Sequence, residues 1–168
     1  MNVMQKFEAM DYAAAPESRG EADAWLKKRD LSKALFVNGE WRAAKSGKTF
    51  AVAEPSTGKQ LARVSEAGKA DIDDAVAAAR RALPKWQAAG GYARARVLYA
   101  IGRAMQRHAR LFAVLESIDN GKPIRESRDI DVPLAMRHFI HHAGWAQNLE
   151  KEFPDHKAVG VAGQIIPW

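Results

Sequence analysis

Hydrophobic positions repeat with two different periods along the chain, and the change of period separates predicted strands from predicted helices. In the first part, short apolar runs alternate with clusters of turn residues, which is typical of hairpins. Asn38-Gly39 favours a two-residue type I′ turn, because both central positions of that turn need a positive φ. A second turn is predicted over 55–58. The predicted strands are 35–37, 40–42, 49–53 and 60–65.

From Asp71 onward, apolar side chains recur at steps of three and four, which is the period of an α-helix. Gly90-Gly91 ends the first predicted helix. The pattern of the next helix continues through Ile118 and stops at Asn120-Gly121, where a left-handed cap and a following proline prevent resumption. A third helix is predicted from about Asp131 to Leu149, and its proline is tolerable only in the first turn.

The two ends of the chain differ in character from its middle. Residues 1–30 are polar and alanine-rich, with one predicted helix over 17–29, and we interpret them as an N-terminal extension to a domain spanning 31–168. Residues 159–166 are interpreted as a buried strand that runs to the C-terminus without a turn, a cap or a polar tail. We therefore expect the sequence to be interrupted within a domain.

Composition excludes several classes of protein. Hydrophobic residues make up 47% of the chain and charged residues 27%, as in ordinary globular proteins. No apolar stretch approaches the roughly 18 residues of a membrane helix. The N-terminus lacks the order of a secretory signal, so we expect a cytoplasmic location. Because none of the 168 residues is cysteine, disulfides, thiolate metal sites and a cysteine nucleophile are excluded within them.

The net charge of +6 raises the question of nucleic-acid binding. The densest basic run alternates with apolar residues at helical spacing, which is typical of the solvated face of an amphipathic helix. Among Phe, Trp and Tyr, only Tyr99 lies within the run, which provides no series of rings to stack on bases, and no nucleic-acid motif is present. We therefore expect no nucleic-acid partner. The run consists of Arg94, Arg96, Arg103, Arg107 and Arg110.

Three groups of residues are candidates for chemistry, and spacing alone assigns an activity to none of them. His138 and His142 are four residues apart on a predicted helix and could hold a metal, although histidines at this spacing are more often part of a polar interface. Asp119-Asn120-Gly121 is consistent with a simple helix cap. The glycines of 159–163 suggest close approach of another backbone or a ligand, but they do not form a dinucleotide-binding fingerprint.

Five motifs in a fixed order resemble the N-terminal third of the aldehyde dehydrogenase superfamily, over about Leu35 to Trp168. The motifs are Leu35-Phe36-Val37-Asn38-Gly39-Glu40-Trp41, Glu54-Pro55-Ser56-Thr57-Gly58-Lys59, Asp119-Asn120-Gly121-Lys122-Pro123, Ala143-Gly144-Trp145-Ala146 and 160–168. Each motif alone is weak evidence for the family, whereas the five motifs in this order are specific to it. The residues in 7–12, 16–17 and 24–26 resemble the lead-in of family 16, a long branch with two aldehyde-dehydrogenase-like domains in one chain.

The resemblance implies an α/β fold, namely the N-terminal part of the aldehyde dehydrogenase fold. That part would comprise two short hairpins, a helical layer and the first strand of a Rossmann-like cofactor domain. The implied activity of the full-length protein is NAD(P)+-dependent oxidation of an aldehyde to a carboxylic acid through a cysteine thiohemiacetal. The alternative from another class is a free-standing, non-catalytic interaction module derived from the same fold.

The resemblance also implies site residues, one position at a time. Ile165, Ile166, Pro167 and Trp168 match the stretch that lines the cofactor cleft near the nicotinamide ribose. Ile130 and Leu134 match positions that line the aldehyde entry tunnel, with plain core packing as the equal alternative. Asp119, with backbone carbonyls near Ala53, matches a position that can hold a monovalent cation.

The implied cofactor is NAD or NADP, the implied substrate an aldehyde, and the implied assembly a homo-oligomer. The link from Asn148 to Ala158 is roughly ten residues shorter than in most members, about the length of a hairpin used in oligomerisation, which puts the usual tetramer in question. The nucleophilic cysteine, the general base and the cofactor-binding loop belong to family sequence beyond Trp168. We therefore expect these 168 residues alone to be inactive and not to bind the cofactor tightly.

Overall fold

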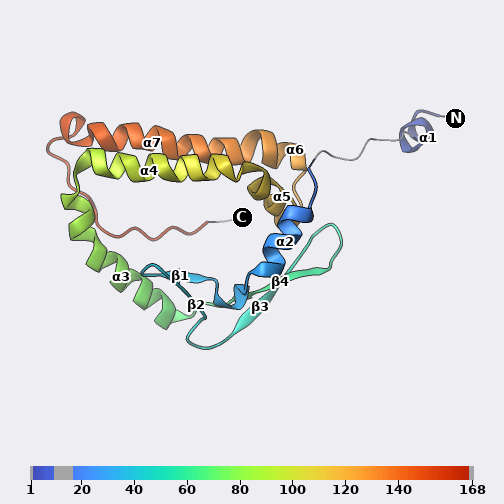
Figure 1. The fold of residues 1–168 in the computed structure, drawn as a ribbon, viewed down its shortest axis with the longest axis horizontal. Helices are drawn as coiled ribbons and strands as arrows, with labels where there is room; N and C mark the ends of the chain where they lie inside the picture. The colour runs from blue at the N-terminus through green and yellow to red at the C-terminus, as the bar shows by residue number, and fades with distance from the viewer. Residues whose placement is uncertain (1, 10–16, 167–168) are drawn as a thin grey trace.

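A computed structural model describes residues 2–9 and 17–166, in which two small hairpins lie beside a layer of helices (Figure 1). Strands occupy the first part of the described chain and long helices the second, as the change of period predicts. The elements in chain order are α1 (Val3–Glu8), α2 (Gly20–Lys28), the 3₁₀ turn η1 (Leu31–Lys33), β1 (Leu35–Val37), β2 (Glu40–Arg42), β3 (Thr49–Ala53), β4 (Gln60–Ser65), α3 (Lys69–Ala88), α4 (Gly90–Arg107), α5 (Ala109–Asn120), α6 (Ile124–Glu126), the π turn η2 (Ser127–Asp131) and α7 (Val132–Glu152).

Both predicted hairpins are confirmed, each as a separate two-stranded antiparallel sheet. In the first, Phe36 pairs with Trp41 and their ring centroids lie 4.9 Å apart. Asn38 and Gly39 have φ values of 56° and 85°, as a type I′ turn requires. The β3–β4 ladder shifts register between Val52 and Ala53. Because an isolated two-stranded sheet is marginally stable, both hairpins depend on the helices beside them.

Helices α4 and α7 lie side by side along most of their length (Figure 1). Two glycines of α4 allow this close approach. A Cβ atom on Gly91 would overlap the carbonyl oxygen of Ala146, and one on Gly102 would lie 2.9 Å from Cγ1 of Ile140. An ion pair between Arg94 and Glu150 adds a link across the same pair of helices. Sequence patterning predicted Gly91 only as a helix end, whereas the structure uses it as a contact surface.

The apolar pattern predicted to run without interruption to Ile118 is divided between two helices. His108 leaves the helical conformation, with φ −110° and ψ 18°, and its N–H is bonded to the carbonyl oxygens of Ala104 and Met105. The chain turns there, so α5 departs from the line of α4 (Figure 1). The predicted stop after Asn120 is confirmed, because Gly121 adopts the left-handed conformation with φ 80°.

The third predicted helix is longer than expected, and a π turn joins it to the short α6 before it. Because α7 begins at Val132, Pro133 lies in its first turn as predicted, while helical structure continues without a break from Ile124 to Glu152. In η2 the N–H of Val132 reaches back five residues to the carbonyl oxygen of Ser127. Proline has no N–H to donate, and a wider turn just before it accommodates that loss without breaking the helix.

The strand predicted over 159–166 is not formed. This segment follows α7 as an extended stretch with no secondary structure, and Val159 and Ile165 are 98% and 96% exposed. A strand needs the N–H and C=O groups of a neighbouring strand, and the described residues provide none beside this segment. The predicted strand is therefore absent from the described structure.

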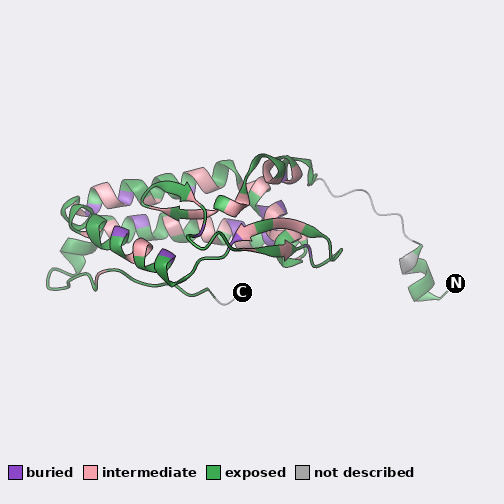
Figure 2. Ribbon diagram, turned by 90° about the horizontal axis from the view of Figure 1, so that it is seen from below, coloured by how far each residue is buried: buried purple, intermediate pink, exposed green. Residues whose placement is uncertain are grey.

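Few positions are buried, as the purple segments of Figure 2 show, and the buried hydrophobic side chains are small. The hydrophobic residues that are buried are Ala22, Ala44, Ala78, Ala95, Ala113, Val114, Val132 and Ala143. Larger apolar side chains stay open to solvent, including Trp41 at 65% and Tyr92 at 67% exposure. Within the described residues, no helix is both long enough and apolar enough to cross a bilayer.

Candidate functional site

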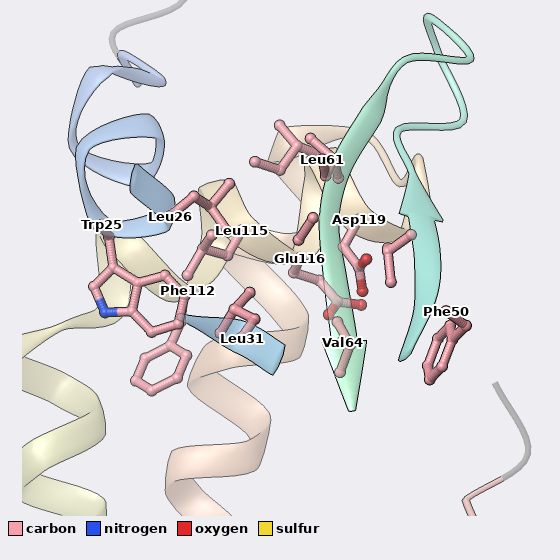
Figure 3. Close-up of a pocket in the computed structure, with 13 residues that line it drawn as sticks. Trp25, Leu26, Leu31, Phe50, Leu61, Val64, Phe112, Leu115, Glu116 and Asp119 are labelled. Carbon is pink, nitrogen blue, oxygen red and sulfur yellow. The ribbon is translucent and has the colours of Figure 1, made fainter. Parts of the chain in front are cut away.

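Asp119 lies in the last turn of α5, where the helix meets the β3–β4 hairpin. The left-handed Gly121 places the chain against Pro55, whose Cβ would be 3.1 Å from a Cβ at that glycine. Asp119 is exposed, and together with Val52 of β3 it lines a cavity of about 600 Å³ (Figure 3). Asp119 and β3, the strand that contains Ala53, thus border the same cavity, and the cation site itself stays a prediction.

Ile130 and Leu134 lie four residues apart on one continuous helical stretch, so they share a face. Ile130 is in the π turn and is 49% exposed, and Leu134 is in the first turn of α7 and is 45% exposed. Neither side chain is a core residue of the described structure. Both are therefore available to contact a ligand or another polypeptide segment.

Ion pairs fix the helical turns around Ile130. Arg128 donates to Glu17 at 2.8 Å and to Asp129 at 2.6 Å, and the hydrogen bonds with these carboxylates raise the pKa of its guanidinium. Lys122 donates to Asp131 at 2.6 Å, and this hydrogen bond raises the pKa of its ammonium group. These ion pairs link the π turn to Glu17 and to Lys122, which follows α5.

The predicted cofactor-cleft residues are not assembled into a site. Ile165 and Ile166 are 96% and 76% exposed in the terminal segment, so both side chains are largely uncovered. Pro167 and Trp168 lie outside the described residues. The structure brings neither isoleucine into a cleft.

The histidines of α7 form an aromatic cluster. The rings of His138 and His142 are 6.1 Å apart, and Nδ1–H of His142 donates to the carbonyl oxygen of His138 at 2.7 Å. His141 accepts a hydrogen bond from Nε1–H of Trp145 at 3.0 Å. Over residues 2–9 and 17–166, no group of three or more histidine, aspartate or glutamate side chains is placed to hold a metal ion. The cluster is therefore a polar aromatic surface.

Sequence patterning missed the link between the N-terminal extension and the body. Arg19 donates to Glu54 at 3.0 Å, and Glu54 is only 7% exposed. Glu54 also accepts from the hydroxyl of Ser56 at 3.0 Å. The hydrogen bond from Arg19 is the main cause that lowers the pKa of Glu54. No local motif signals this pair, because 35 residues separate its members.

The elements around these residues match a known family. Residues 41–168 match the aldehyde dehydrogenase family, so the chain belongs to that family. Aldehyde dehydrogenase B of Escherichia coli is 39% identical over 143 residues, which are 79% of this chain and 28% of that protein. Retinal dehydrogenase 2 of Homo sapiens is 36% identical over 147 residues, 80% of this chain and 28% of that protein.

Solved structures show the same relationship. An aldehyde dehydrogenase of Bacillus cereus superimposes with a TM-score of 0.70 at 34% identity, covering 81% of this chain and 27% of that one. PnpE in complex with nicotinamide adenine dinucleotide superimposes with a TM-score of 0.67 at 34% identity, covering 80% and 25%. The α/β fold predicted from the motifs is confirmed as part of the aldehyde dehydrogenase fold. The chain spans between 27% and 30% of the length of the curated relatives it matches.

Proposed function

We propose that this chain is the N-terminal portion of an NAD(P)+-dependent aldehyde dehydrogenase that oxidises an aldehyde to a carboxylic acid. The family match over residues 41–168 carries the proposal. The family reaction needs a thiolate to attack the aldehyde, and the 168 residues include no cysteine. This portion would therefore contribute walls to the site, while the nucleophile and the general base come from other residues.

Each predicted site residue has a proposed role. Ile130 and Leu134 would line the path of the aldehyde, which their shared, half-open helical face supports. Asp119 would help to hold a monovalent cation beside β3, which its place in the cavity with Val52 supports. The segment 165–168 would line the cofactor cleft. Assignment to the family 16 branch, a homo-oligomer and a cytoplasmic location remain proposals that rest on the sequence.

The fit of this chain to NAD or NADP is partial. The cofactor supplies a hydride acceptor when it is bound. Its phosphates need backbone N–H groups at a glycine-rich loop and a helix N-terminus. In the described segment, Ile165 and Ile166 offer exposed apolar side chains, which can contact a ring but cannot donate a hydrogen bond to a phosphate. We therefore expect a cofactor-cleft wall without phosphate contacts.

Purified chain should form no NADH or NADPH from an aldehyde and should bind no NAD+ at millimolar concentration by calorimetry. A complete relative, Aldehyde dehydrogenase B of Escherichia coli, serves as the positive control. Turnover that purifies with this chain would contradict the proposal.

The coding sequence gives an independent test, because we expect it to continue past Trp168 into Asn-Phe-Pro and later a cysteine. A stop codon with stable expression would favour the non-catalytic interaction module.

A further inference from the structure

We propose that the cavity between α2, the β3–β4 hairpin and α5 binds an amphipathic organic cation, an alkylammonium ion. Its apolar chain would lie on the aromatic and aliphatic walls, and its ammonium group would lie at Glu116 and Asp119. The site shares only Asp119 with the groups proposed for the aldehyde dehydrogenase reaction. The inference does not depend on that reaction.

The cavity has the size and walls of a small-molecule site. Its volume is about 600 Å³, and ligand pockets generally measure roughly 300–1,000 Å³. Three separate segments of the chain supply its walls, so it is a feature of the tertiary fold (Figure 3). The apolar side chains that line it include Trp25, Leu26, Leu31, Phe50, Phe112 and Leu115.

Two carboxylates interrupt this apolar surface, and neither has a cationic partner. Over the described ranges 2–9 and 17–166, no Lys, Arg or His nitrogen lies within 4.0 Å of an oxygen of Glu116 or Asp119. Glu116 accepts only a 3.3 Å hydrogen bond from the amide of Asn120. The nearby Lys122 is held by Asp131, and Arg29 lies 5.4 Å from the ring centroid of Trp25. Glu116 and Asp119 are therefore the only charged residues in the lining of the cavity, and the charge of Lys122 acts on Glu116 from outside it.

The spacing of these groups on α5 defines the shape of the ligand. Glu116 and Asp119 are three residues apart and so lie on one face of the helix. Phe112 is seven residues before Asp119, a helical rise of about 10 Å. Figure 3 shows Trp25 beside Phe112, with the two carboxylates further along the helix. An extended chain of about six carbons with a terminal ammonium covers most of this distance.

Only an amphipathic cation uses both parts of the cavity. A neutral apolar ligand would leave two carboxylates without a partner in a site it had partly dried, which is unfavourable. A bare metal cation held at Asp119 would use only the carboxylate end of the cavity and would leave the aromatic walls in water. An ammonium group on an alkyl chain pairs with the carboxylates and removes the apolar wall from solvent.

The proposal can be tested by NMR titration of the full chain with hexylammonium and, in parallel, 1-hexanol. The probe is the indole N–H signal of Trp25, assigned with the variant Trp25→Phe. We expect hexylammonium to shift that signal and to bind about fivefold more tightly than 1-hexanol. In the double variant Glu116→Gln/Asp119→Asn, hexylammonium affinity should fall to that of 1-hexanol. The matched control Asp155→Asn removes an exposed carboxylate elsewhere and should change neither affinity.

A second measurement needs no variant and so does not depend on how a variant folds. Propylammonium retains the charge and loses half of the chain, so it should bind to the wild-type protein about tenfold more weakly than hexylammonium. Equal affinities for hexylammonium and 1-hexanol, or shifts that spare Trp25, would overturn the proposal. So would the absence of binding. None of these outcomes bears on the NADH assay, so the two proposals fail independently.

Discussion

The α4–α7 helix pair and the terminal segment 159–166 both contain apolar residues and glycine, yet only the helix pair forms regular secondary structure. A helix satisfies its backbone hydrogen bonds within itself, and α4 and α7 then cover one another through Gly91 and Gly102. A strand can satisfy its hydrogen bonds only with a second strand. The contrast shows that an apolar segment forms a helix or a strand only where the same chain provides the surface or the strand that it packs against.

The largest expected difference between the helix pair and the terminal segment is in their rates of amide hydrogen exchange. Amides in the middle of α4 and α7 should exchange about a thousandfold more slowly than those of 159–166, because the terminal amides have no acceptor within the described residues. The measurement is native-state exchange followed by mass spectrometry or NMR. Strong protection at Ile165 and Ile166 would mean that the terminal segment pairs within the chain or with a second copy, and the contrast would then disappear.

Substitution of the contact glycines Gly91 and Gly102 should destabilise the packing of α4 against α7. Gly91→Ala places a Cβ against the carbonyl oxygen of Ala146, which is backbone and cannot move aside. We expect a loss of about 1–3 kcal/mol in the free energy of unfolding, measured by chemical denaturation. Gly102→Ala should cost less, because its nearest contact is the flexible side chain of Ile140.

Gly144 is the matched control, because it lies in α7 with no atom within 4 Å of an added Cβ. Gly144→Ala should stabilise the protein by about 0.5–1 kcal/mol, since alanine favours the helix. If Gly91→Ala and Gly144→Ala have the same effect, close approach at Gly91 does not hold the two helices together.

The sequence predicted those features that depend on neighbours in the chain. The turn at Asn38-Gly39 and the cap at Gly121 follow from backbone preferences of single residues. The break at His108 could not be predicted, because apolar spacing continues across it. Neither could the Arg19–Glu54 pair, which joins residues far apart in sequence.

The same reasoning applies to the candidate site. The family resemblance implied Asp119, Ile130 and Leu134 as site residues, and the structure places all three at the surface or in a cavity. The unpaired state of Glu116 and Asp119 depends on where Lys122 finds its partner, which is a tertiary property. The strand at 159–166 was predicted from its own residues, without regard to the neighbour that a strand requires.

Deletion of residues 158–168 tests whether the terminal segment promotes association between chains without stabilising the rest of the fold. Exposed Ile165 and Ile166 on an unpaired extended segment favour association between chains. We expect the deletion to raise the soluble fraction and lower the binding of a hydrophobic dye more than deletion of residues 1–30 does. The melting temperature should stay unchanged, because the segment contributes no buried side chain to the described structure. A lower melting temperature would show that the segment packs on the body.

The smallest expected effect concerns acid stability and the Arg19–Glu54 pair. Its hydrogen bond lowers the pKa of Glu54 below the ordinary 4.5, so the unfolded chain takes up a proton at a higher pH than the folded chain does. The stabilisation is therefore complete above 4.5 and is lost as the pH falls through the lowered pKa of Glu54. Arg19→Ala should flatten the dependence of unfolding free energy on pH in this range.

Lys69→Ala is the control for that measurement, because it removes an exposed ion pair with Asp73 whose members are 88% and 62% accessible. Other carboxylates with lowered pKa values, such as Asp71, keep their own contributions in every variant. The informative quantity is thus the difference in slope between wild type and each variant, obtained from denaturant titrations at several pH values. Parallel curves for wild type and Arg19→Ala would mean that Glu54 is held ionised by Ser56 and its surroundings, and that the N-terminal extension is not fastened to the hairpin through this pair.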